Sequence, residues 1–176
     1  GTAGCVRACL EHGLTYNQTQ RLWYTGPMFR YERPQKGRYR QFYQFGLEAF
    51  GYSSAYIDAE ILAFCARLWQ LLGIADQVKL QINCLGTPEV RAKYKQALVA
   101  YFTKFIDQLD EDSKRRLDKN PLRILDSKNP DLKTLINAAP KLTDYLDDCS
   151  SKHMQILCAN LSNLNIKYEV NPFLVR

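Results

Sequence analysis

The chain has 176 residues, which suits one domain of ordinary size or a piece of a larger protein. Its hydrophobic and charged fractions, 46% and 24%, are typical of a globular protein and exclude a disordered or fibrous chain. No apolar run approaches the roughly 18 residues of a membrane-spanning helix, and the first residues lack the pattern of a signal peptide. The chain starts without Met and stops one residue after an apolar triplet, so we expect a fragment cut at both ends.

The net charge of +6 is concentrated in one segment. Residues 21–41 hold six basic side chains and one acidic side chain, a local net charge of +5. The concentration favours a polyanion-binding site over a diffusely basic surface. A solvated basic loop is the alternative interpretation.

Six cysteines occur without a CxxC pair, which predicts reduced thiols and a cytoplasmic protein. Cys5, Cys9 and His12 have helical spacing, but a fourth zinc ligand is not visible, so we interpret the cysteines as small packing residues and expect no metal site. His12 and His153 are interpreted as structural or solvated.

The N-terminal third predicts a helix followed by a hairpin. The helix is expected over 2–12, with Thr2 as its cap, Gly13 as its end, and Val6, Cys9 and Leu10 on its buried side. The first hairpin arm comprises strand-like residues 21–25 and 28–32 around a Gly-Pro pair, and the second arm covers 39–50. The loop between them is rich in turn-forming and basic residues.

The rest of the chain alternates between core-like and helical patterns. A helical stripe predicts a helix over 55–72, and residues 78–83 alternate as a strand. Thr87 caps a further helix, after which repeated prolines predict short kinked helices. The remaining elements expected are short helices over 107–150, a helix over 151–164, a strand over 166–170 and a strand at 173–175.

These elements predict an α+β fold in which an antiparallel sheet with flanking helices is interrupted by an all-helical insertion. The expected domains are a core over 1–86, an insertion over 87–165 and a return strand over 166–176.

The hairpin is expected to carry the chemistry, because residues two apart share a face of a strand. One face combines a guanidinium, two carboxylates, an amide, an aromatic ring and a glycine that would leave space above the sheet. Such a face fits a flat base, a phosphate and a small polar ligand, although an ordinary solvated hairpin is an equal alternative. The other face is expected to be an aromatic core face. The ligand face holds Met28, Arg30, Glu32, Phe42, Gln44, Gly46 and Glu48, and the aromatic face holds Phe29, Tyr31, Tyr43, Phe45 and Leu47.

The string Phe29-Arg30-Tyr31-Glu32, with the loop over 33–42, resembles motif 2 of class II aminoacyl-tRNA synthetases. More narrowly, residues 1–4 and 33–42 are similar to bacterial histidyl-tRNA synthetases, and residues 174–176 resemble the start of that family's histidine signature. No Walker-type phosphate loop is present, so a P-loop fold is not expected.

The resemblance implies a role for each matching residue. Arg30 would bind the α-phosphate of ATP, Glu32 the adenine amino group, and Arg38 the terminal phosphates. Phe42 would stack under the adenine, and Tyr43 would serve packing only. The histidine pocket would be lined by Thr2, Arg30, Gln44, Glu48 and Arg176, with Arg30 and Arg176 catalytic and Arg176 facing the same side as Arg30 and Gln44.

The resemblance further implies an enzyme that uses ATP with Mg²⁺, L-histidine and tRNA(His), is a homodimer at full length, and does not bind membranes. The insertion would approach the acceptor end of tRNA with Lys114, Arg115, Arg116 and Lys119. The dimer-forming motif, motif 3 and an anticodon-binding domain would lie beyond this chain. Two alternatives stay open: a non-catalytic regulatory paralogue of a histidine-biosynthesis enzyme, and a bare RNA-binding module.

Overall fold

The computed structural model describes residues 1–175 and divides the chain into two compact units, Gly1–Ile61 and the remainder from Leu62 onward. The division falls within one helix, α2 (Ala55–Leu71), and not at the expected boundary near residue 86, so the domain boundaries stay a prediction.

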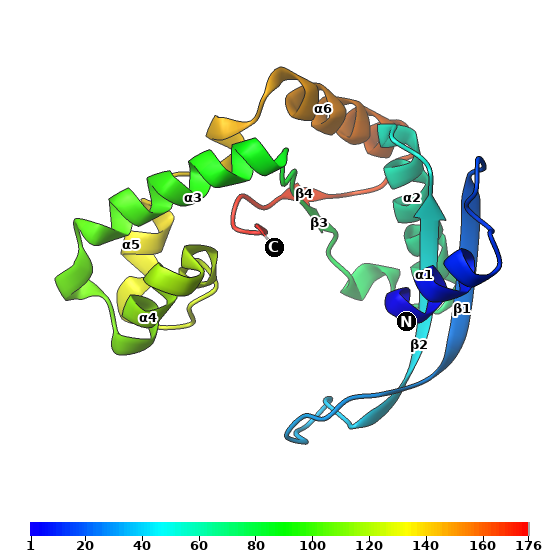
Figure 1. Cartoon of the computed structure of the whole chain (residues 1–176), viewed down its shortest axis with the longest axis horizontal. Coiled ribbons are helices and arrows are strands. Elements are labelled where there is room, and N and C mark those ends of the chain that lie inside the picture. Colours follow the sequence, from blue (N-terminus) through cyan, green and yellow to red (C-terminus); the bar gives the residue numbers. More distant parts are fainter. Residues whose placement is uncertain (176) are drawn as a thin grey trace. The chain divides into compact units, whose positions relative to one another are not determined.

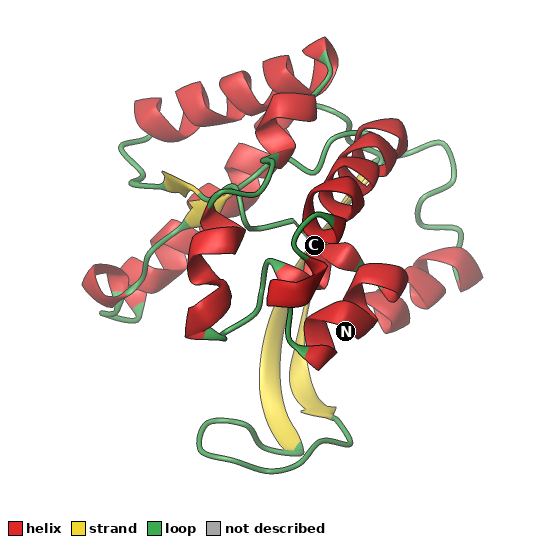
Figure 2. Ribbon diagram, turned by 90° about the vertical axis from the view of Figure 1, so that its left-hand side faces the viewer, coloured by secondary structure: helices red, strands yellow, loops and turns green. Residues whose placement is uncertain are grey.

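The first unit is built on a long antiparallel hairpin. Its strands are β1 (Gln20–Phe29) and β2 (Gln41–Phe50), paired in unbroken register from Gln20 opposite Phe50 to Phe29 opposite Gln41 (Figures 1 and 2). β1 runs through Gly26 and Pro27 without the break that the sequence suggested. Proline lacks a backbone N–H donor, but each strand of a two-stranded sheet has one unpaired edge where no donor is needed, so Pro27 does not interrupt the pairing.

Helix α1 (Thr2–Glu11) contacts β2. The helix forms where it was predicted, but Gly1 is its N-cap and Thr2 its first helical residue, without a side-chain capping bond. Cys9 is buried as expected, whereas Leu10 is exposed. The packed face of α1 is narrower than the set of apolar residues on the helix, so Leu10 lies outside it.

The second unit is mostly helical. Thr87 caps α3 (Pro88–Thr103) as predicted, since its hydroxyl accepts a hydrogen bond from the Val90 amide at 3.3 Å. Asp147 caps α6 (Asp148–Asn163), which begins three residues before the predicted start because the cap at this aspartate went unrecognised in the sequence. The other helices are α4 (Glu111–Lys119), α5 (Lys133–Asn137) and the short 3-10 segments Ala75–Gln77, Ile106–Gln108, Pro121–Ile124, Pro130–Leu132 and Leu142–Tyr145.

One apolar core joins α3, α4 and α5 with the segments between them. Tyr94, Leu98 and Phe102 from one face of α3 are fully buried, and Ile124 and Leu142 pack into the same cluster. The spacing of the α3 residues is the 3.6-residue period that predicted this helix. The region over 107–150 forms short helices, as its prolines predicted, and its apolar residues pack against α3.

Two short strands flank the helical segment. β3 (Gln81–Ile82) pairs in parallel with β4 (Glu169–Val170), so the chain leaves and re-enters this small sheet at neighbouring positions. Both strands are shorter than the predicted 78–83 and 166–170, because each has only one partner among residues 1–175 and pairing covers two positions.

The predicted strand at 173–175 is wrong. The amides of Phe173 and Leu174 donate to the side-chain and main-chain oxygens of Asn171, at 2.9 and 3.1 Å, which makes this segment a turn. A hydrogen bond from the backbone amide two residues later to an Asn side chain stabilises such a turn.

The predicted mix of helices with an antiparallel hairpin is confirmed. No helix among residues 1–175 has the length and hydropathy needed to cross a bilayer.

Candidate active site on the hairpin

The predicted ligand residues do share one face of the hairpin. Met28 and Phe42 are cross-strand partners, Gly26 faces Gln44, Tyr24 faces Gly46, and Leu22 faces Glu48. All of these residues are half-buried, whereas the alternate positions of β1 are exposed. The face therefore runs from Glu48 at one end to Arg30 and Glu32 beyond the last strand pair.

Arg30 and Phe42 contact each other directly. The guanidinium carbon of Arg30 lies 4.1 Å from the centre of the Phe42 ring, and its Nε donates to the Tyr39 carbonyl at 3.1 Å. A guanidinium over an aromatic ring is attracted by the negative face of the ring. These two contacts hold the arginine against the Phe42 ring, and its terminal nitrogens have no hydrogen-bond acceptor among residues 1–175.

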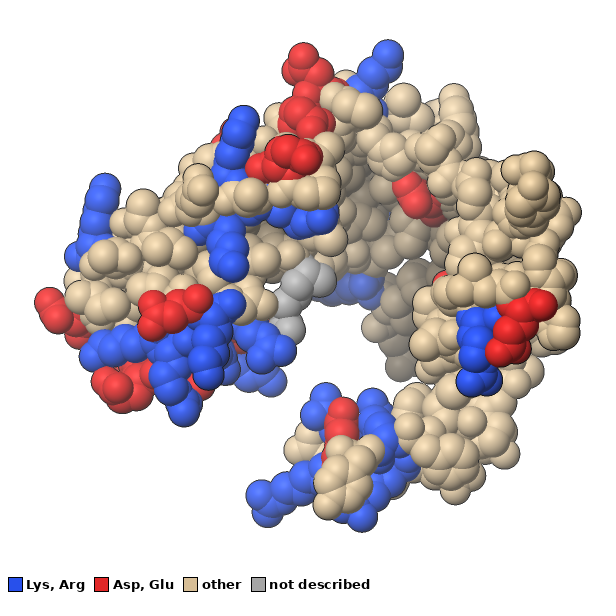
Figure 3. Space-filling view, in the orientation of Figure 1, with Lys and Arg blue, Asp and Glu red and all other residues tan. Residues whose placement is uncertain are grey.

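Glu32 lies within the basic loop. Its Oε2 is 3.0 Å from Arg38 Nε, and Arg40 Nε donates to its main-chain oxygen at 3.0 Å. The Arg38 contact is an ion pair whose angle falls outside hydrogen-bond geometry, so this buried oxygen has no hydrogen-bond donor within residues 1–175. The Lys and Arg side chains of this loop gather at the end of the hairpin (Figure 3).

Glu48 has a partner that the sequence did not predict. Tyr24 donates from its hydroxyl to Glu48 Oε1 at 3.3 Å, and its ring lies over Gly46. A Cβ on Gly46 would overlap the ring, so the space expected above Gly46 is filled by Tyr24. The signal was available, because alternation along β1 places this aromatic residue on the ligand face.

The open space lies one residue pair further along. A Cβ added to Gly26 would meet no atom within 4 Å, and Gly26 is the cross-strand partner of Gln44. The gap therefore lies between Tyr24 on one side and Phe42 on the other.

α1 lies against the same face. Gly1 packs on the Tyr24 ring. Burial raises the pKa of the Cys5 thiol, and Cys9 and the nearby Glu48 carboxylate raise it further. Thr2 is exposed at the start of this helix. Arg176 lies outside the described residues.

The expected aromatic core face is wrong. The side chains of Trp23, Phe29, Tyr31 and Tyr43 are 66–95% exposed, and Trp23 stacks on Phe45 with ring centres 5.9 Å apart. Alternation predicts which residues share a face, but not which face is covered. Here α1 lies on the opposite face, beside Tyr24 and Glu48.

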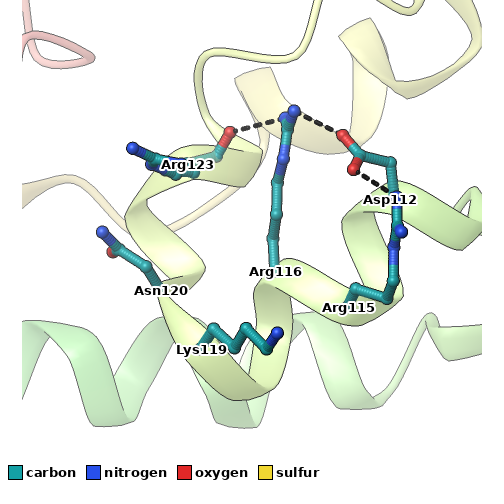
Figure 4. Close-up of a pocket in the computed structure, with 6 residues that line it drawn as sticks. All are labelled: Asp112, Arg115, Arg116, Lys119, Asn120 and Arg123. Atoms are coloured by element: carbon teal, nitrogen blue, oxygen red, sulfur yellow. Dashed lines mark hydrogen bonds and ion pairs between the residues drawn. The ribbon is translucent and has the colours of Figure 1, made fainter.

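A second basic site occurs in the helical unit, where α4 and the following turn line a hollow of about 360 Å³ (Figure 4). Arg115 pairs with Asp112 at 2.9 Å, and Arg116 lies between the Asp112 carboxylate and the main-chain oxygen of Arg123. Lys119 and Arg123 line the hollow without an ion-pair partner in residues 1–175. Four cations therefore face one carboxylate, and Figure 3 shows basic side chains gathered over this region.

The described residues contain no group of three or more His, Cys, Asp or Glu side chains placed to hold a metal ion. The face combines an arginine on an aromatic ring, a carboxylate oxygen in an ion pair with Arg38, and a second carboxylate beside a gap. This combination on an antiparallel hairpin is typical of motif 2 in class II aminoacyl-tRNA synthetases, so the fold and the face define that class of protein.

The comparisons narrow the class to a family. The profile of the histidyl-tRNA synthetase family matches residues 2–172, so the chain belongs to that family. It is 60% identical over all 176 residues to the histidine–tRNA ligases of the Lens and Philadelphia 1 strains of Legionella pneumophila. It also matches the crystal structure of apo S. aureus histidyl-tRNA synthetase with a TM-score of 0.75 and 38% identity, covering 100% of this chain and 40% of that one. The chain spans 41% of the length of these Legionella relatives.

Proposed function

We propose that the protein carrying this chain activates L-histidine with ATP and transfers it to the 3′ end of tRNA(His). The observation that carries the proposal is that one hairpin face holds the residues that match the family's motif, which are Arg30, Glu32, Phe42, Gln44 and Glu48. The family membership supports the same activity. The regulatory-paralogue alternative is not favoured, because relatives matching the whole chain are named ligases.

Activation joins two anions. The histidine carboxylate attacks the α-phosphorus of ATP, an O–P bond forms, and pyrophosphate leaves with the electrons of the broken bond. Positioning and cations placed where charge develops supply most of the acceleration in such reactions. Arg30 is proposed to bind the α-phosphate, because a guanidinium holds two oxygens at once. The attack of a terminal ribose hydroxyl of tRNA on the adenylate carbonyl then releases AMP.

The ATP end of the face comprises Phe42, Glu32 and Arg38. Phe42 offers an aromatic ring on which adenine would stack. The Arg30 guanidinium already lies against this ring, so the base and the guanidinium would be neighbours. The buried Glu32 oxygen lacks a hydrogen-bond donor among residues 1–175, and the adenine amino group would supply one. Arg38 would move from its ion pair with Glu32 to the terminal phosphates. Mg²⁺ enters with ATP as part of the substrate.

The histidine end comprises Gln44 and Glu48, with Thr2 on the neighbouring helix. The amide and the carboxylate would hydrogen-bond the imidazole and the ammonium group, which explains acidic side chains on a basic hairpin. The proposed contributions of Arg30 and Arg176 to this pocket and to catalysis rest on the family resemblance.

The helical segment is proposed to be an insertion over 87–165 that contacts tRNA. The parallel pairing of β3 with β4 supports an insertion, since the flanking segments meet. The hollow around Arg115, Arg116, Lys119 and Arg123 supplies cations for phosphates, and Lys114 lies beside it on α4. We further propose a homodimer at full length and a cytoplasmic location, where tRNA charging takes place.

The test is tRNA charging by a protein of full family length that contains this chain. Labelled histidine should appear on tRNA only when ATP is present. Glu48→Ala should weaken histidine binding while ATP binding survives, since the substrate loses its charged partner. Equal loss of both ligands in calorimetry would indicate a folding defect in that variant, and absence of charging by the unsubstituted protein would overturn the proposal.

A further inference from the structure

Tyr24 is the polar side chain of the hairpin face to which neither the motifs nor the proposed function assigns a role. It stands on β1, two residues from Gly26, and its hydroxyl reaches Glu48 Oε1 at 3.3 Å. Here the hydroxyl donates to a carboxylate beside the gap over Gly26.

The ring of Tyr24 is confined by backbone on two sides. A Cβ on Gly1 or on Gly46 would overlap the ring, so any side chain larger than hydrogen at either position would displace the tyrosine. Glycine on both sides lets the backbone of α1 and of β2 approach the ring. The hydroxyl is consequently held in one place, with little rotamer freedom to lose.

The hydrogen bond from the Tyr24 hydroxyl also orients the Glu48 carboxylate. With Oε1 engaged by Tyr24, the Glu48 side chain is limited to the rotamers that keep this contact, and its second oxygen is left for a ligand. A pre-oriented carboxylate binds a cationic or N–H donor ligand more tightly than a freely rotating one, because less freedom is lost on binding.

We propose that Tyr24 is a positioning and specificity residue for the amino-acid substrate, acting by orienting Glu48. The inference rests on the proposed function, in which Glu48 binds histidine. The ring also forms the wall of the gap on the histidine side, so Tyr24 limits the size of the ligand that reaches Glu48.

The test is Tyr24→Phe in a full-length protein that contains this chain, assayed by histidine-dependent exchange of pyrophosphate into ATP. Removal of one hydroxyl should raise the KM for histidine about tenfold, since hydrogen bonds to charged groups contribute in that range. The KM for ATP and the thermal midpoint should stay unchanged, because the ring still fills its place. Tyr43→Phe, on the exposed opposite face, is the matched control and should change nothing.

A double-substitution cycle separates positioning from packing. In a Glu48→Gln background, Tyr24→Phe should raise the KM for histidine by less than about twofold, because the carboxylate it orients is gone. An unchanged histidine KM in Tyr24→Phe, an equal rise in both KM values, or additive effects in the cycle would overturn the inference. Absence of exchange in the unsubstituted protein would instead overturn the proposed function itself.

Discussion

The guanidinium of Arg30 lies 4.1 Å from the centre of the Phe42 ring, so the proposed α-phosphate ligand and the proposed adenine platform are in direct contact. The two residues come from opposite arms of the hairpin, and the register that pairs Met28 with Phe42 brings them together. Binding of adenine and of the α-phosphate is therefore expected to be coupled through this contact.

Replacement of Arg30 by Lys tests the assignment of Arg30 to the α-phosphate. Lysine keeps the charge but loses the planar fork that lies on the ring and holds two oxygens. We expect Arg30→Lys to lower pyrophosphate exchange about 100-fold or more, with a small change in thermal midpoint. Exchange near the unsubstituted rate would contradict the assignment of Arg30 to the α-phosphate.

Two glycines of the hairpin give a matched steric pair. A Cβ added at Gly26 meets no atom within 4 Å, whereas one added at Gly46 overlaps the Tyr24 ring. Gly26→Val should therefore keep or raise the stability of the hairpin, because valine favours strands, and yet block ligand binding. Gly46→Ala should lower stability as well.

Calorimetric titration with ATP and with histidine, together with thermal unfolding, distinguishes the two variants. Full binding by Gly26→Val would show that the ligands do not occupy the gap beside Gln44.

The basic hollow on α4 predicts an effect on tRNA alone. Lys119 and Arg123 line it without ion-pair partners in residues 1–175, so reversal of both charges should weaken tRNA binding. The salt dependence of binding should also fall, by about one unit of slope for each phosphate that the variant no longer binds. Pyrophosphate exchange should be unchanged. Lys93→Glu, an equal charge change per residue on the exposed side of α3, serves as the control.

The measurement is filter binding of tRNA over a range of salt concentrations. A loss in the control variant as large as that in Lys119→Glu/Arg123→Glu would indicate a diffuse charge effect, and no loss in either would reject the hollow as a tRNA-binding surface.

Tyr94 predicts how the stability of the helical unit depends on pH. Burial raises the pKa of Tyr94 from 10.0 to about 12, and its hydroxyl donates to the Pro140 carbonyl at 3.0 Å. The folded chain thus keeps a proton that the unfolded chain releases. The contribution of Tyr94 to the free energy of unfolding should be fully present below pH 10. It should fall as pH rises from 10 toward 12, by up to about 1.4 kcal/mol per pH unit.

Tyr94→Phe should cost about 1 kcal/mol at neutral pH through the lost hydrogen bond, and should flatten this alkaline decline. Urea unfolding of the chain followed at several pH values measures both effects. An equally steep decline in the Phe variant would assign the pH dependence to other groups.

The sequence predicted the features that depend on local period and local capping. Alternation placed Arg30, Gln44 and Glu48 on one face, and the Thr87-Pro88 pair marked the start of α3. It could not predict which face of the hairpin is covered, because that depends on where α1 packs. Alternation also places Tyr24 on the ligand face, but the packing of its ring between Gly1 and Gly46 depends on where α1 lies.

The lengths of the short strands β3 and β4 could not be predicted from the sequence either. Residues 78–83 alternate like a strand, yet only Gln81 and Ile82 pair, because strand length is set by the partner as much as by the segment. The turn at Asn171 likewise depends on a side-chain contact that competes with an extended pattern.

The most direct test of the proposed histidine activation is exchange of labelled pyrophosphate into ATP. The assay uses a protein of full family length that contains this chain, with each amino acid supplied in turn. The face from Glu48 to Glu32 predicts exchange with histidine alone, and its loss in Arg30→Lys. Exchange without dependence on histidine, or no exchange by a folded protein that binds both ligands, would contradict the account.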